Sequence, residues 1–292
     1  MQYIIENEAL RVTVNSFGAE LAGITRKRDQ AELLWNADGR FWKRSAPVLF
    51  PFVGGVKEKQ YRFGGETYPM GQHGFARDNE FALTEKKDGE IWFAFTDTEE
   101  TRKVYPFRFR LELGYRLEGN RLTAFWRVKN TGEGEMYYSI GGHPAFMCPV
   151  GAEGKQTDYS ISFDTDAAEL SYGRLSAAGL LESEGHKLTL KDGRLPVTEH
   201  LFDLDALILE GDQAHRVALV DPQGKEYLVV HFDAPLFGLW SPAGKGAPFI
   251  CIEPWYGRCD RESFSGSLEE REYGQSLKQG EEKEYAYSIE VL

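Results

Sequence analysis

A chain of 292 residues with a hydrophobic share of 41% can bury a large core, and its 19 Phe, 14 Tyr and 6 Trp favour the half-buried surfaces of β-sheets. The formal net charge of −12 argues against binding to nucleic-acid phosphates, which needs a basic surface, and against attraction to an anionic membrane. Three cysteines without a CxxC pair argue against a disulfide framework and favour a reducing cytoplasm.

The predicted elements, taken in chain order, are short strands separated by turns. The first residues, MQYIIENEALRVTV, form a hairpin pattern and carry acidic residues where a signal peptide needs a basic start and an apolar run. Strands are predicted at residues 3–5, 10–14, 91–95, 108–117, 122–128, 158–163, 206–210, 216–220, 227–232 and 284–291. Helical periodicity is confined to residues 38–43 and 263–270. This pattern predicts an all-β fold of antiparallel sheets in a single domain, residues 1–292.

Three regions interrupt the strand pattern with glycine, proline, polar and aromatic residues. They are residues 45–59 running on to 70–77, residues 138–149, and residues 248–257. Loops and distorted strand ends on a rigid scaffold often carry function. We therefore expect the functional residues in these regions.

A carboxylate and two imidazoles stand out in these regions. Glu253 lies between an apolar run and a Pro-Trp step, where burial would raise the pKa of its carboxyl. His143 and His73 both lie next to glycines. Such groups can exchange general acid and base roles near neutral pH, as the exchange of sugar anomers requires, and that reaction needs no metal or organic cofactor. From the residues alone, each group also has a structural interpretation, and the three together could form a two-His, one-carboxylate metal set, although local metal-ligand spacing is missing.

Four segments carry a family resemblance: APVLFPFVG, GQHGFAR, GGHPAF and IEPWYG. In their order and spacing along nearly the whole chain they resemble the motifs of the aldose 1-epimerase (galactose mutarotase-like) family, and most nearly those of its LacX-type bacterial branch. The resemblance implies an antiparallel β-supersandwich with few short helices. It also implies a cofactor-independent isomerase that interconverts the α and β anomers of a free aldose.

The same resemblance implies a role for each candidate residue. Glu253 would take the proton of the anomeric hydroxyl, His143 would protonate the ring oxygen, and His73 would form a hydrogen bond at or near that oxygen. Asp205 would hold sugar hydroxyls, although Asp203 is expected to share its strand face.

Several aromatic residues could stack on a sugar face, although core packing is the default for each of them: Trp42, Phe75, Phe146, Trp240 and Trp255. Phe75 and Trp255 have the better claim, because they adjoin the catalytic candidates.

One departure from the family pattern concerns Gly55, where related proteins often carry an arginine that reaches a sugar hydroxyl. Arg77, Lys57 or Lys59 could replace that arginine, and Arg77 is the best placed of them because it follows His73 closely. Loss of the arginine also leaves open a non-catalytic carbohydrate-binding or sugar-sensing protein on the same fold.

A phosphosugar 1-epimerase is a further alternative. It would need Arg77, Arg44 or nearby lysines gathered into one anion pocket, and the acidic composition does not favour it. For every alternative the expected partner is a small-molecule sugar, with no nucleic acid and no membrane. The expected chain is a cytoplasmic monomer or homodimer.

Overall fold

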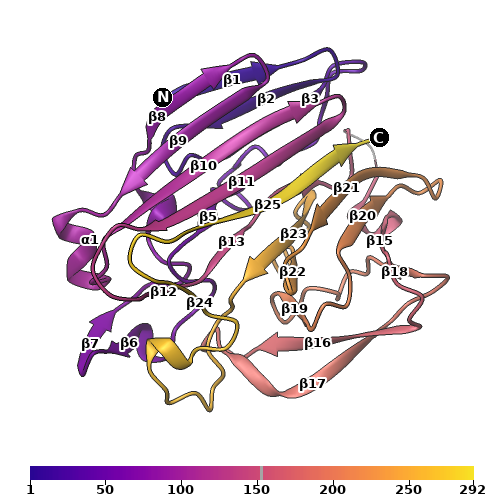
Figure 1. Cartoon of the computed structure of the whole chain (residues 1–292). Helices are drawn as coiled ribbons and strands as arrows, with labels where there is room; N and C mark the ends of the chain where they lie inside the picture. Colours follow the sequence, from indigo (N-terminus) through magenta and orange to yellow (C-terminus); the bar gives the residue numbers. More distant parts are fainter. Residues whose placement is uncertain (152–153) are drawn as a thin grey trace.

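The computed structural model describes residues 1–151 and 154–292, and its elements are nearly all β-strands, as the sequence predicts (Figure 1). Strands pair antiparallel in every sheet. Within the described residues the helical elements are few and short: α1 (Glu99–Val104), η1 (Lys57–Lys59), η2 (Ala76–Asp78), η3 (Gln156–Asp158) and η4 (Leu268–Glu270). None of the helices there is long and apolar enough to cross a membrane.

One large sheet has nine strands. In spatial order they are β18 (Arg194–Pro196), β15 (Ser160–Phe163), β20 (Arg216–Val220), β21 (Glu226–Phe232), β25 (Glu282–Val291), β11 (Arg121–Asn130), β10 (Phe109–Glu118), β9 (Glu90–Thr96) and β8 (Ala82–Lys87). Burial alternates residue by residue along all of β11, because successive side chains of a strand point to opposite faces of the sheet. One face of the sheet therefore joins the core and the other meets solvent.

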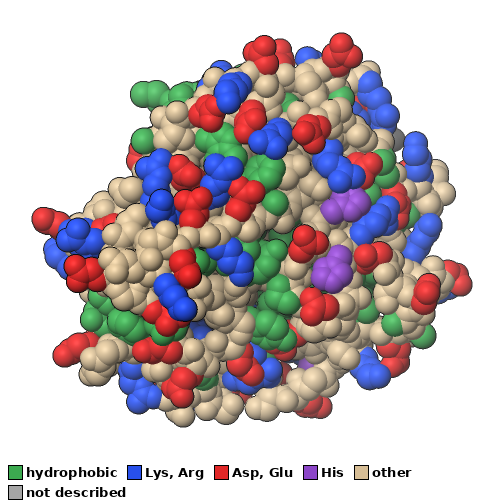
Figure 2. Space-filling view, viewed as in Figure 1, with side chains coloured by type: hydrophobic (Ala, Val, Ile, Leu, Met, Phe, Trp, Pro, Cys, Tyr) green, Lys and Arg blue, Asp and Glu red, His purple; other side chains and the backbone are tan. Residues whose placement is uncertain are grey.

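The solvent-facing side of this sheet carries interspersed acidic and basic side chains (Figure 2). Several of them form cross-strand pairs between directly opposed residues, such as Arg116 with Glu90 and Arg121 with Glu290. Opposite charges facing each other across neighbouring strands stabilise the pairing of those strands. The charge pattern of this face thus supports the sheet itself.

The second large sheet carries the site described below. Its order is β17 (Leu181–Thr189), β16 (Glu169–Leu175), β19 (Leu207–Glu210), β22 (Leu236–Trp240), β23 (Phe249–Tyr256), β13 (Ile140–Gly142) and β5 (Val48–Leu49), and β14 (Ala145–Met147) also pairs with β23. On β23, Ile250 and Ile252 join the main hydrophobic cluster, which also contains buried residues of the nine-stranded sheet. The alternate residues, including Glu253 and Trp255, point to the other face of β23.

Three smaller sheets complete the structure. The first contains β1 (Gln2–Glu6), β2 (Leu10–Asn15), β3 (Leu21–Arg26) and β4 (Ala31–Glu32), the second β6 (Gln60–Phe63) and β7 (Glu66–Pro69), and the third β12 (Met136–Tyr138) and β24 (Gln275–Leu277). The Tyr3 ring packs edge-on against Phe93 of β9 at 5.4 Å, which joins the first small sheet to the nine-stranded sheet.

All ten predicted strands are present to within a few residues, but several other expectations need correction. Residues 38–43 form a turn rather than a helix, and only the end of 263–270 is helical, as η4. Residues 248–257, interpreted as an interruption, are almost entirely the strand β23. The helix α1 was not predicted, although the Thr98 side chain caps it by accepting a hydrogen bond from the backbone N–H of Thr101. Cys148, Cys251 and Cys259 are all free, as expected.

Candidate active site

The register of the second sheet brings a carboxylate and an imidazole together. β14 pairs with β23 so that Ala145 lies opposite Cys251. Two residues along each antiparallel strand, His143 therefore comes opposite Glu253 on the same face. Nε2 of His143 lies 3.3 Å from Oε2 of Glu253. The sheet itself thus sets the geometry of this pair.

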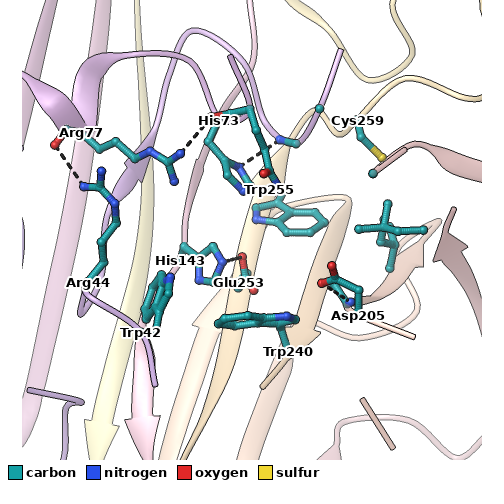
Figure 3. A pocket seen from close by; sticks show the side chains of 17 residues that line it. Trp42, Arg44, His73, Arg77, His143, Asp205, Trp240, Glu253, Trp255 and Cys259 are labelled. Carbon is teal, nitrogen blue, oxygen red and sulfur yellow. Dashed lines mark hydrogen bonds and ion pairs between the residues drawn. The ribbon is translucent and has the colours of Figure 1, made fainter. Parts of the chain in front are cut away.

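A cavity of about 350 Å³ opens over the pair (Figure 3). This volume lies at the lower end of the range typical of small-molecule sites. Six of the residues that the sequence singles out line it: Glu253, His143, His73, Asp205, Arg77 and Trp255. Four segments far apart in the sequence therefore converge on one cavity.

Aromatic rings enclose the imidazole of His143. Trp42 stacks on it with centroids 4.7 Å apart, and Trp240 contacts it edge-on at 5.4 Å. His143 is only 8% exposed. Burial, followed by the positive charge of Arg77, lowers the pKa of His143 to about 3, because both disfavour the charged imidazolium. His143 is consequently neutral at neutral pH.

His73 is held through its backbone and its ring by one glycine. The backbone N–H of Gly54 donates to Nδ1 of His73 at 3.1 Å, and the backbone N–H of His73 donates to the carbonyl of Gly54 at 2.9 Å. Since Nδ1 accepts this hydrogen bond, the neutral ring carries its proton on Nε2. Burial lowers the pKa of His73 well below its ordinary value, which favours the neutral ring. His73 is a hydrogen-bond donor beside His143, with ring centroids 5.8 Å apart.

Glu253 is the most buried of the ionisable groups in this cavity, with 1% exposure. Burial, followed by the negative charge of Asp205, raises the pKa of its carboxyl well above the ordinary value. Burial thus disfavours the charged forms of both members of the His143–Glu253 pair. These shifts favour the form of the pair with a neutral imidazole and a protonated carboxyl, and a single proton transfer between the two residues would convert this form to the ionised one.

Unsatisfied polar atoms cluster at this cavity. Within residues 1–151 and 154–292, five buried side-chain atoms have no hydrogen-bond partner, and four belong to cavity residues: Arg77 Nε, His143 Nδ1, Glu253 Oε2 and Trp255 Nε1. Buried polar groups are rarely left without partners in a folded protein. A ligand rich in hydroxyl groups, such as a sugar, offers both donors and acceptors to such atoms.

The Gly54–Gly55 segment is held by contacts with Cys259 and Asp260. Gly54 has φ +73°, and a Cβ there would lie 2.6 Å from Cβ of Cys259, so only glycine fits this close approach. The backbone N–H of Asp260 donates to the carbonyl of Gly55 at 3.0 Å, and Oδ2 of Asp260 accepts from the backbone N–H of Lys57 at 2.9 Å. The segment that holds His73 is therefore itself held by the chain that follows β23.

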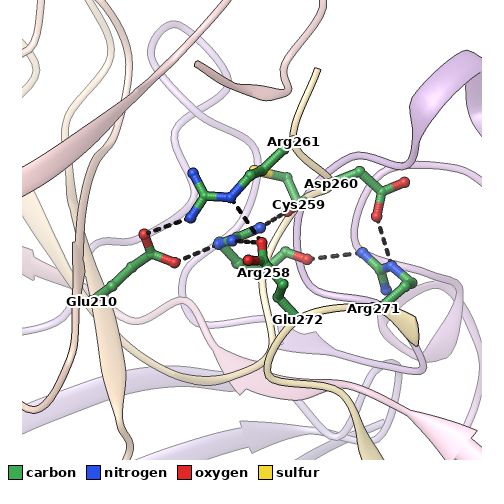
Figure 4. A network of polar contacts seen from close by, with 7 residues as sticks. All are labelled: Glu210, Arg258, Cys259, Asp260, Arg261, Arg271 and Glu272. Carbon is green, nitrogen blue, oxygen red and sulfur yellow. Dashed lines mark hydrogen bonds and ion pairs between the residues drawn. The ribbon is translucent and has the colours of Figure 1, made fainter. Parts of the chain in front are cut away.

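A buried ionic network fixes that chain in turn (Figure 4). Nε of Arg271 donates to Oδ1 of Asp260 at 2.7 Å, and Nη2 of Arg271 donates to the carbonyl of Arg258 at 2.8 Å. Arg258, itself 2% exposed, donates to Glu210 at 2.6 Å and also to Glu272. We infer that this network positions Gly54 and, through it, His73.

Gly55, where the family arginine is missing, lies under the hairpin of β16 and β17. A Cβ at Gly55 would lie 3.0 Å from the carbonyl oxygen of Gly179, so a side chain there requires the turn between β16 and β17 to shift. Of the three residues considered as replacements, only Arg77 lines the cavity. Lys57 points away, since its ammonium donates to the carbonyls of Glu262 and Phe264 at 2.7 and 3.1 Å, and Lys59 is exposed.

Two expectations about individual residues need correction. Asp205 lies in a turn with φ +70°, not on a strand, and its Oδ1 accepts from the backbone N–H of Ala206 at 2.8 Å. Asp203 does not share a strand face with it; its carboxylate contacts Nδ1 of His200 at 2.8 Å. Phe75 packs into the core, with Tyr105 and Phe109 each 6.1 Å away by centroids, and is not among the cavity-lining residues of the described chain.

Sequence reasoning gave too little weight to Trp42 and Trp240, which line the cavity, because the lone aromatics of such a chain are by default core residues. A metal set of two histidines and one carboxylate is not assembled either. The described residues hold one group with three ligand-type atoms within 4.8 Å of one another, and it consists of His143, Cys251 and Glu253 without His73. The sequence did not indicate Cys251 as a member of this group. Its thiol is buried next to His143 and Glu253.

Comparisons with known proteins show which family the chain resembles in sequence and fold. The sequence profile described as aldose 1-epimerase matches residues 1–290. The chromosomally encoded protein LacX of Lactococcus lactis subsp. lactis is 32% identical over 274 residues, which is 91% of this chain and 89% of LacX. A galactose mutarotase related enzyme from Lactobacillus acidophilus is similar at 34% identity and a TM-score of 0.94, covering 100% of this chain and 97% of that one. A galactose mutarotase-like protein from Lactobacillus casei ATCC 334 reaches 31% identity and a TM-score of 0.93, with 100% of both chains covered.

Proposed function

Because this chain belongs to the aldose 1-epimerase family, we propose that it is a mutarotase that interconverts the α and β anomers of an aldose in the cavity over Glu253 and His143. The observation that carries the proposal is the 3.3 Å approach of the two side chains to each other beside the ring of Trp42, in a cavity that can admit a sugar. Anomer exchange needs one proton acceptor and one proton donor at adjacent oxygens of a sugar ring.

The proposed reaction starts when Glu253, in its ionised form, takes the proton of the anomeric hydroxyl. The C1–O1 bond becomes a carbonyl, the bond between C1 and the ring oxygen breaks, and His143 gives its proton to that oxygen. After rotation about the C1–C2 bond, the same steps run in reverse and close the ring on the other face. The pair holds one proton before and after the cycle, so no outside acid or base is consumed.

The surrounding residues are assigned supporting roles. His73 carries a proton on Nε2 and donates it as a hydrogen bond at or near the ring oxygen, which assists bond breaking there. Asp205 binds sugar hydroxyls at the opposite end of the cavity, and the indole of Trp255 offers an apolar face and an unpaired N–H to the sugar. Phe75 is assigned no role, because it packs against the core and does not line the cavity.

Polarimetry of freshly dissolved α-glucose and α-galactose tests the proposal. The wild-type protein should speed the approach to anomeric equilibrium, and Glu253→Gln and His143→Asn should each slow it by at least about 10²-fold, the scale of a general acid or base. His73→Asn should have a smaller effect. Glu133→Gln and His200→Asn change exposed residues outside the cavity and should retain the wild-type rate.

The non-catalytic alternative predicts a different result. A binding or sensor protein would bind sugar in calorimetry. In polarimetry, the wild-type protein and Glu253→Gln would then show the same slow anomer exchange. A matched acid and base in contact favour the enzyme, because binding alone requires no proton exchange. We also propose that the protein is cytoplasmic, since the three free cysteines of the chain suit a reducing compartment.

A further inference from the structure

Two arginines lie side by side at one end of the cavity (Figure 3). Arg44 reaches it from the segment before β5, and Arg77 reaches it from η2. Nη1 of Arg44 lies 3.4 Å from the backbone oxygen of Arg77, and their side chains are 24% and 18% exposed. Two cations that face one small cavity are unexpected in a chain with a net charge of −12.

The carboxylates of the chain only partly balance these charges. Asp78 contacts both guanidiniums, with Oδ1 2.5 Å from Arg44 and Oδ2 3.8 Å from Nε of Arg77, and its side chain is 52% exposed. Glu20 lies 4.0 Å from Arg44, but its other oxygen accepts from backbone N–H groups at 2.6 and 3.0 Å, and burial raises the pKa of its carboxyl. One half-exposed carboxylate is therefore shared by two guanidiniums.

Arg77 keeps one buried donor without a hydrogen bond in the described chain, since its Nε lies 3.8 Å from Oδ2 of Asp78, too far for one. Its Nη2 donates to the carbonyl of Gln72 at 2.9 Å, which fixes the direction of the guanidinium, whereas its buried Nε has no partner. Burial, followed by the positive charge of Arg44, lowers the pKa of Arg77 to about 10. An anion between them would relieve the repulsion and accept the free N–H groups, whereas a neutral hydroxyl would do only the second.

The connectivity of a sugar ring determines which part of the substrate reaches these arginines. If Glu253 meets the hydroxyl of C1 and the histidines meet the ring oxygen, C5 is the next atom beyond that oxygen, and C5 carries C6. Arg77 donates a hydrogen bond to the carbonyl of Gln72, the residue just before His73. The two arginines therefore lie next to His73, on the side of the ring oxygen and C5. Asp205 lines the cavity at the other end, toward C2 and C3 (Figure 3).

We propose that the substrate is an aldose with an anionic group at C6, a phosphate ester or a carboxylate, bound between Arg44 and Arg77. This inference rests on the proposed mutarotase function, because that function sets the orientation of the ring. It refines the choice of substrate and leaves the proton chemistry at Glu253 unchanged.

The test compares three sugars by NMR exchange spectroscopy of their anomeric protons: glucose, glucose 6-phosphate and glucuronate. We expect kcat/KM for at least one charged sugar to exceed that for glucose by about tenfold or more, the effect of one charge-assisted hydrogen bond. Added salt should raise KM for the charged sugar only, because salt screens the interaction. The charged sugar with the larger advantage identifies the anionic group.

Variants assign the effect to the two arginines. Arg77→Gln and Arg44→Gln should each lower the ratio of kcat/KM between the charged sugar and glucose by about tenfold. Asp78→Asn removes the competing carboxylate and should raise this ratio. Arg40→Gln, a matched loss of one charge in the same loop, changes a side chain that is 82% exposed and pairs with Asp38, and it should leave the ratio unchanged. Circular dichroism confirms that each variant is folded.

The outcomes separate this inference from the proposed function. Exchange of glucose at least as fast as that of both charged sugars overturns the anionic substrate and leaves the mutarotase intact. A preference for charged sugars that survives both arginine substitutions also overturns it, because other groups would then bind the anion. If none of the three sugars is exchanged faster than in buffer, the proposed function itself fails.

Discussion

The buried pair of Asp260 and Arg271 offers the sharpest prediction about how the active site is held. Their side chains are 5% and 4% exposed, and Asp260→Ala would leave the Arg271 guanidinium with the carbonyl of Arg258 and the face of Phe52, 4.6 Å away, as its remaining described partners. Removing one member of a buried ion pair typically costs about 3–5 kcal/mol. The backbone N–H of Lys57 also loses its acceptor, so we expect the upper part of this range.

Urea unfolding followed by tryptophan fluorescence measures this cost, and a double-mutant cycle isolates the pair. Arg271→Met combined with Asp260→Ala removes both charges, so the double variant should be less destabilised than the sum of the single variants by about 2 kcal/mol or more. Lys103→Ala, which removes one partner of an exposed pair with Glu100, should change stability little. Additive effects, or a loss below about 1 kcal/mol for Asp260→Ala, would refute the buried network as a clamp.

Three further predictions concern the cavity. Because burial keeps the pKa of His143 at about 3, kcat/KM should hold as pH falls through 6.5 and decline only in stronger acid; a decline centred near 6.5 would contradict the shared-proton pair. Burial raises the pKa of the Glu253 carboxyl in the folded protein well above the ordinary value of 4.5 that it has in the unfolded chain, so the contribution of this residue to stability falls as pH rises above 4.5. The melting temperature of Glu253→Gln relative to wild type should accordingly increase from about pH 5 to pH 8, and a constant difference would argue against the raised pKa. Gly55→Arg should lower the melting temperature without raising activity, because its side chain would crowd the carbonyl oxygen of Gly179. A variant that is as stable as wild type and more active would contradict this prediction.

Much of the fold is legible in the sequence because half-buried strands alternate. β11 reads as a strand since its burial has a period of two over its entire length. β23 was counted among the interruptions because it combines proline with polar and aromatic residues, and in the structure seven of its eight residues are buried, on both faces of the sheet. A strand buried on both sides shows no alternation, and its Pro254 adds a residue that strands rarely contain.

The sequence predicted the residue types of the candidate site but not their arrangement in space. Glu253 and His143 are 110 positions apart in the sequence, and only the pairing of β14 with β23 places them face to face. The turn that carries Asp205 and the inward rotation of Phe75 depend equally on tertiary packing. Glycine and proline around a polar residue indicate a special backbone, but they do not reveal which neighbours the backbone meets.

A crystal structure of Glu253→Gln with a bound sugar tests the central proposal most directly, because the substitution slows turnover while preserving the shape of the side chain. We predict that the anomeric hydroxyl lies within hydrogen-bonding distance of the residue 253 amide and the ring oxygen within that distance of His143. A sugar whose C1 lies at the Asp205 end, out of reach of both residues, would contradict the assignment of this pair as the proton-transfer groups.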